Sequence, residues 1–122
     1  MGRLKQELLD RVEVFSHRVL DVVDVLEKQG GSRRILDQMT GAGTAIGANT
    51  WEADEALSSP DFCKTLGIVL KELSETRFWL RVPTRRGWLK PNRLASLQQE
   101  ALELRRILGS IVARTKARTR KK

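Results

Sequence analysis

Residue types that build reactive or cross-linked sites are scarce in this 122-residue chain. A single cysteine, Cys63, excludes an intramolecular disulfide and a cysteine-based metal site. A single histidine, His17, with no cysteine cluster makes neither a zinc site nor a catalytic triad. Tyrosine is absent and only three prolines interrupt the chain, which argues against a sheet-rich fold. No apolar run approaches the ~20 residues of a membrane helix, and no signal peptide is evident. The sequence therefore predicts a reduced, cytoplasmic protein.

Charge is abundant but unevenly distributed. Residues 1–76 hold 9 Lys/Arg against 13 Asp/Glu, a net charge of −4. Residues 77–122 hold 14 Lys/Arg against two acids, a net charge of +12. A chain this polarised presents its basic part to something negative, while its acidic part supports solubility. The pattern favours nucleic acid as the partner, with an acidic protein as the alternative.

Apolar residues recur at alternating spacings of four and three in four stretches, within residues 8–26, 35–56, 62–80 and 94–111. A repeat averaging 3.5 residues is typical of helices packed at shallow angles. With Gly30-Gly31, Ser58–Asp61, Pro83 and Pro91 as boundaries, helices are expected over about residues 4–28, 33–57, 60–82 and 91–115. Short connections predict an all-α, antiparallel up-down-up-down four-helix bundle over 1–115, followed by a basic tail over 116–122.

The first and fourth helices are more apolar than one core face requires. The surplus residues are Leu9, Val14, Leu20, Val23 and Val25 on the first, and Leu102, Ile107 and Val112 on the fourth. Such a wide apolar band predicts a second buried surface, and hence a homo-oligomer. The alternative is a wide core in a small bundle.

The glycine-rich segment 41–47 invites a nucleotide-loop interpretation that fails. Its glycine spacing is one residue too long for the dinucleotide fingerprint, no strand precedes it, and it lacks Gly-Lys-Ser/Thr. We interpret Gly43 and Gly47 as positions where another helix approaches closely, because glycine destabilises a helix by about 1 kcal/mol relative to alanine and close packing must offset that cost. Asn49, on the expected core stripe, would fix helix register; a ligand contact is the alternative. No catalytic, cofactor-binding or metal-binding residues are predicted, so the chain is not expected to be an enzyme.

Cations without acidic neighbours form the candidate binding site. Residues 77–93 contain no acid and interleave Trp79 and Trp88 with basic residues, and residues 114–122 are also free of acids. Arginines on a structured loop can bind phosphates bidentately, and a basic tail adds counterion release. The predicted nucleic-acid-binding residues are Arg77, Arg81, Arg85, Arg86, Lys90, Arg93, Arg105, Arg106, Arg114, Lys116, Arg118 and Arg120.

Three stretches carry a family resemblance: residues 43–49, residues 71–80 (Lys71-Glu72 with Glu75 to Leu80) and residues 103–111. Together they resemble the four-helix-bundle proteins encoded in intervening sequences of bacterial 23S rRNA genes. That family also contains the accessory variability proteins of diversity-generating retroelements. The resemblance implies a ring of about five subunits without catalytic residues. For the retroelement branch it implies binding to a reverse transcriptase and to nucleic acid; the rRNA branch remains the alternative.

Overall fold

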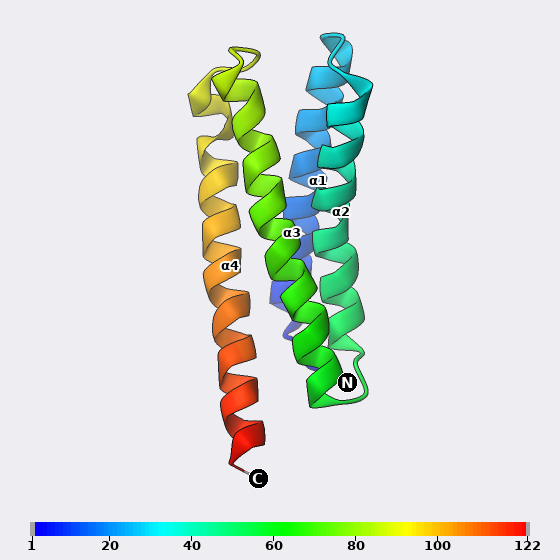
Figure 1. The fold of residues 1–122 in the computed structure, drawn as a ribbon, viewed down its shortest axis with the longest axis vertical. Coiled ribbons are helices and arrows are strands. Elements are labelled where there is room, and N and C mark those ends of the chain that lie inside the picture. Colours follow the sequence, from blue (N-terminus) through cyan, green and yellow to red (C-terminus); the bar gives the residue numbers. More distant parts are fainter. Residues whose placement is uncertain (1, 122) are drawn as a thin grey trace.

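The computed structural model describes residues 2–121, which form four helices. Helix α1 spans Gln6–Lys28, α2 Arg33–Asp54, α3 Ser59–Arg85 and α4 Pro91–Arg120. Consecutive helices pack side by side and run antiparallel, and α4 projects past the other three at its C-terminal end (Figure 1). The predicted all-α, antiparallel four-helix bundle is confirmed.

The core consists of the apolar stripes of all four helices. Fully buried side chains come from each of them and include Phe15, Met39, Leu73 and Leu104. Part of the apolar surplus belongs to this core, since Leu9 and Val23 are also buried. Leu20, Val25, Ile107 and Val112 are half-buried, and only Val14 and Leu102 are exposed. The wide-core alternative therefore accounts for some of the surplus, and less apolar surface is left for a second interface than the sequence indicated.

Two glycines with positive φ close the turns at one end of the bundle. Gly30 (φ 79°) follows α1 and Gly87 (φ 74°) follows α3, in a left-handed conformation that only glycine adopts without strain. In each turn the next residue donates its N–H five residues back, as Gly31 does to the Leu26 carbonyl at 2.9 Å. These turns place the α1–α2 and α3–α4 connections at the same end of the molecule (Figure 1).

The prediction that Pro83 ends the third helix is wrong. Pro83 is buried inside α3, which continues to Arg85. Pro83 has no N–H to donate to the Trp79 carbonyl one turn back, and the helix ends two residues later, at Arg85. The Pro83 carbonyl accepts the Trp88 N–H at 2.8 Å, so the proline takes part in the closing turn.

Helix α4 also continues beyond the predicted boundary, through Arg120, where a basic tail from residue 116 was expected. Thr115 is only 5% exposed and lies beside Ser59 and Phe62 at the start of α3. Its hydroxyl donates to the Ile111 carbonyl at 2.8 Å. The last turns of α4 therefore keep a packed face, which holds Lys116, Arg118 and Arg120 on a helix.

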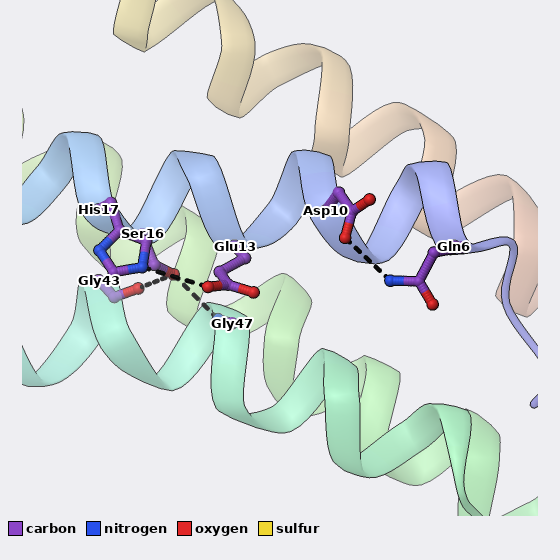
Figure 2. A network of polar contacts seen from close by, with 7 residues as sticks. All are labelled: Gln6, Asp10, Glu13, Ser16, His17, Gly43 and Gly47. Carbon is purple, nitrogen blue, oxygen red and sulfur yellow. Dashed lines mark hydrogen bonds and ion pairs between the residues drawn. The ribbon is translucent and has the colours of Figure 1, made fainter.

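Small residues bring α1 and α2 into close contact. A Cβ at Gly43 would lie 2.5 Å from Val19 Cγ1, and one at Gly47 would lie 2.9 Å from Ser16 Oγ. The buried Ser16 hydroxyl donates to the Gly43 carbonyl at 2.7 Å and accepts from the Gly47 N–H at 3.1 Å (Figure 2). These two backbone groups are four residues apart, the spacing at which helical groups normally pair with each other. We call this arrangement the Ser16 clasp.

Asn49 does not occupy the core position that its sequence spacing predicted. The next residue, Thr50, is fully buried, whereas Asn49 is half-buried. The Asn49 amide donates to the Ala45 carbonyl in its own helix at 2.9 Å, and Thr50 Oγ1 donates to the Ile46 carbonyl at 2.7 Å. The rest of the predicted stripe largely holds, since Met39, Ala42, Ile46 and Ala53 are buried, and Thr50 takes the core position expected for Asn49.

Candidate nucleic-acid interface

The two acids of the basic C-terminal third face α1 and are paired there. Arg11 Nε donates to Glu100 Oε2 at 2.7 Å, and Arg11 Nη2 reaches Glu100 Oε1 at 2.8 Å and Glu103 Oε1 at 2.9 Å. These hydrogen bonds raise the pKa of Arg11, and the bond from Arg11 lowers the pKa of Glu100 despite partial burial. The only acids after Glu75 are thus neutralised on one flank of α4.

The opposite flank of α4 faces α3. Gln98 Nε2 donates to the Arg77 carbonyl at 3.1 Å, which brings these positions of α4 and α3 together. Arg105 lies two turns after Gln98 and Arg81 one turn after Arg77, so both lie on this side. Farther along, Lys116 and Arg120 of α4 line a groove of about 460 Å³ with Lys64 of α3.

We define the α3–α4 basic face as the eight exposed cations on the outer side of this helix pair. The α3–α4 basic face comprises Lys64, Lys71, Arg81, Arg85, Arg105, Arg106, Lys116 and Arg120. None of them forms an ion pair with a residue among 2–121. By the helical repeat the acids of α3 lie on the opposite flank from Arg77 and Arg81, whereas exposed Glu75 lies one turn after Lys71 and borders the row of Lys64 and Lys71.

The α3–α4 basic face is long and includes exposed apolar groups. From Lys64 to Arg85 the helix rises by about 30 Å, a length along which one strand of duplex carries about nine phosphates. Lys64, Lys71, Phe78 and Arg85 recur every seven residues and form one row on α3. The Phe78 ring is 56% exposed and packs edge-to-face on Trp79, with centroids 5.1 Å apart. An aromatic ring among cations can stack on an unpaired base.

The remaining predicted residues lie elsewhere. Arg77 is half-buried, and its Nε is buried without a partner among the described residues, so Arg77 is part of the helix contact. Arg86 and Lys90 lie in the α3–α4 connection, where the Arg86 guanidinium lies 6.0 Å from the Trp88 ring centroid. Arg93 lies beside it in the first turn of α4 and lines a groove with Asp21 of α1. The structure thus divides the predicted set among several surfaces.

Arg114 and Arg118 lie on the α1 flank of α4, and Arg118 also lines a cavity with Ser59 and Phe62 of α3. They line a second groove, of about 480 Å³, together with the start of α1. Helical spacing separates Arg114 and Arg118 from Lys116 and Arg120, because side chains two positions apart on a helix point in nearly opposite directions.

Sequence reasoning missed Lys64 and Lys71, because they belong to the part of the chain with net negative charge. Their seven-residue spacing with Phe78 and Arg85 was the available signal. It also missed Lys28 and Arg34, which are exposed at the α1–α2 connection, at the same end of the bundle as Arg86 (Figure 1).

The described residues offer few groups for chemistry. Within residues 2–121, no group of three or more His, Cys, Asp or Glu side chains is placed to hold a metal ion. His17 Nε2 lies 3.3 Å from Glu13 Oε2, and both side chains are exposed on α1 (Figure 2). Over the same residues, no helix combines the length and apolar character needed to cross a membrane.

Comparison with known proteins places this bundle in a family. The family described as 23S rRNA-intervening sequence protein matches residues 5–110. The fold is similar to the crystal structure of a protein of unknown function from the S23 ribosomal protein family of Bacteroides thetaiotaomicron. That protein has 30% sequence identity and a TM-score of 0.82, over 86% of this chain and 97% of the other. No curated protein matches the sequence. The chain therefore belongs to the 23S rRNA-intervening sequence protein family.

Proposed function

We propose that this protein is a non-enzymatic, cytoplasmic nucleic-acid-binding adaptor, and that it binds RNA or DNA through the α3–α4 basic face. One observation carries the proposal: eight exposed cations without an ionic partner among residues 2–121 share this face, while Glu100 and Glu103 are turned toward α1 and held by Arg11. Unpaired cations along a rigid helix pair can neutralise phosphates without first breaking internal ion pairs. The affinity then comes mainly from backbone charge and shape.

The proposal includes assembly into a homo-oligomeric ring, most simply a pentamer, which would repeat the basic face and make binding multivalent. The exposed Val14 and Leu102 and the family resemblance support it. The most specific version of the proposal names the partner as the reverse transcriptase of a diversity-generating retroelement together with its template RNA or cDNA. Only the resemblance supports that form, and flanking DNA that encodes a reverse transcriptase would strengthen it.

The test compares two triple variants of equal charge. Arg81, Arg85 and Arg105 are changed to Ala on the face; Arg86, Lys90 and Arg93 are changed at the α3–α4 connection. Labelled RNA and DNA are titrated by fluorescence anisotropy at several salt concentrations. On duplex, the face variant should weaken binding and flatten the log–log salt slope by about 2.7 per engaged subunit, since each phosphate contact contributes about 0.9.

The connection variant should have a clearly smaller effect, and circular dichroism should show both variants folded. Equal losses would mean that binding follows net charge and not this face. Unchanged binding in both variants would leave the basic face as a solvated surface. Light scattering tests the assembly separately: a mass several times 13.9 kDa is expected, and a clean monomer would contradict the ring.

A further inference from the structure

A second groove lies between α1 and α4, on the flank of α4 away from the α3–α4 basic face. Its volume is about 480 Å³, and half-buried Leu4, Leu8, Ile107 and Ile111 form its floor. The polar contacts between α1 and α4 are made nearer the connections, by Arg11 to Glu100 and by Arg18 to Ser96. Beyond Arg11, toward the C-terminus of α4, apolar side chains of both helices remain partly open to solvent.

One wall of the groove is fixed by the N-terminal segment. The Leu4 N–H donates to Asp54 Oδ1 at 2.7 Å, and the Arg3 N–H donates to the Asp54 carbonyl at 3.1 Å. Arg3 Nε donates to the Ala56 carbonyl at 2.8 Å, and its guanidinium lies 5.5 Å from the Phe62 ring centroid. These contacts fasten the segment before α1 to the end of α2, so the groove exists before any partner binds.

The rim of the groove is positive. Lys5, Arg114 and Arg118 are exposed and form no ion pair with a residue among 2–121, and the groove has one acidic lining residue, Glu7. The Arg3 charge is likewise not paired with a carboxylate, because its contacts are a carbonyl and a ring. A ligand that fits must therefore combine apolar groups for the floor with negative charge for the rim.

Nucleic acid does not fit that description. No aromatic side chain lines the groove to stack on a base, and a sugar–phosphate backbone has no aliphatic groups to bury against two leucines and two isoleucines. A second copy of this chain also fits poorly. Its exposed apolar residues on the acidic helices, Val14 and Trp51, lie on different helices, so either helix would insert a single apolar side chain.

We propose that this α1–α4 groove binds an acidic amphipathic helix of a partner protein. From Ile107 to Arg118 the wall rises by about 17 Å, the length of about three helical turns. On α4 the floor residues Ile107 and Ile111 are spaced by four, which matches a ridge of apolar residues on an incoming helix, and Leu4 and Leu8 line the other side. Aspartates and glutamates beside that ridge would meet Lys5, Arg114 and Arg118. The proposal is independent of the nucleic-acid function, because it uses the opposite flank of α4.

The probe is a labelled peptide of about 14 residues, with leucines at helical positions i, i+4, i+7 and i+11 and glutamates elsewhere. Its control has the same composition with the leucines spread around the helix. Full-length protein carrying Arg114→Glu and Arg118→Glu is compared with protein carrying Arg105→Glu and Arg106→Glu. All four positions are exposed on α4, so each pair imposes the same charge change on the same helix.

The amphipathic peptide should bind the parent, and the Arg114/Arg118 variant should weaken binding about tenfold while RNA affinity changes little. The Arg105/Arg106 variant should do the reverse. Amide NMR shifts on peptide addition should concentrate in residues 4–8 and 107–118. Equal binding of the scrambled peptide, or shifts centred on α3, would overturn the proposal. A drop in oligomer mass in the Arg114/Arg118 variant would also overturn it, by assigning the groove to contacts between copies.

Discussion

Replacement of Gly43 by alanine tests whether the close approach of α1 and α2 is set by this missing side chain. The added Cβ would lie 2.5 Å from Val19 Cγ1 and 2.9 Å from Val19 Cβ, where ordinary contact begins at 3.4 Å. The two helices must therefore separate by up to about 0.9 Å or Val19 must move, and Val19 is fully buried and β-branched. Separation would also stretch the Ser16 clasp.

The magnitude follows from two opposing effects. Alanine gains about 1 kcal/mol over glycine in a helix, whereas overpacking of a well-packed core costs about 1–3 kcal/mol. Stretching the Ser16 hydrogen bonds adds a cost of about 1 kcal/mol. We therefore expect Gly43→Ala to lower the free energy of unfolding by about 1–3 kcal/mol, measured by urea denaturation with far-UV circular dichroism.

Gly41→Ala is the matched control, because it lies two residues away in the same helix and a Cβ there meets nothing within 4 Å. It should raise the free energy of unfolding by about 0.5–1 kcal/mol through helix propensity alone. Adding Val19→Ala to the Gly43 variant removes both Cγ atoms, so the double variant should lose less than the sum of the two single losses. A Gly43→Ala protein as stable as Gly41→Ala would refute the steric account.

Three further outcomes are expected. Ser16→Ala leaves two buried backbone groups of α2 without its hydroxyl and should cost about 1–3 kcal/mol in urea unfolding; a loss below 0.5 kcal/mol, roughly the noise level, would contradict the clasp. Arg11→Met removes the partner that lowers the pKa of Glu100, a stabilisation present above the unfolded carboxyl pKa and lost as pH falls. Its cost should therefore stay constant from neutral pH down to the unfolded carboxyl pKa of about 4.3, and decline only as pH falls further, through the lowered pKa of folded Glu100; a cost independent of pH would argue against the ion pair. Phe78→Ala should weaken binding of single-stranded RNA by about 1–3 kcal/mol with little effect on duplex, by anisotropy; equal losses on both would exclude base stacking.

The four helices follow from the sequence because the spacing of apolar residues repeats the geometry that buries them. The helix ends were less predictable. Pro83 removes one helical hydrogen bond, and the two helical residues after it are followed by a closing turn made by Gly87 and the Trp88 N–H, which local sequence rules do not weigh together. The end of α4 depends on Thr115, which is buried and lines the same cavity as Phe62, 53 positions earlier in the chain.

The candidate site was predicted as a charge total and not as a surface. A count along the chain shows that residues 77–122 are basic, but it cannot show that Glu100 and Glu103 meet Arg11, about 90 residues earlier. It also divides the chain at residue 76, so Lys64 and Lys71 were assigned to the acidic part. The helical repeat returns both of them to the same row as Arg85.

The last cations of α4 show why helical structure matters for both proposals. Arg114, Lys116, Arg118 and Arg120 alternate with other residues, and in a flexible tail this spacing would carry no spatial information. On a helix, each step of two residues turns the side chain by about 200°, so successive cations point to opposite flanks. Arg114 and Arg118 accordingly line the α1–α4 groove, whereas Lys116 and Arg120 join Lys64 on the α3–α4 basic face. One short basic segment can thus contact an acidic helix on one side and phosphates on the other, and variants two residues apart should separate the two activities.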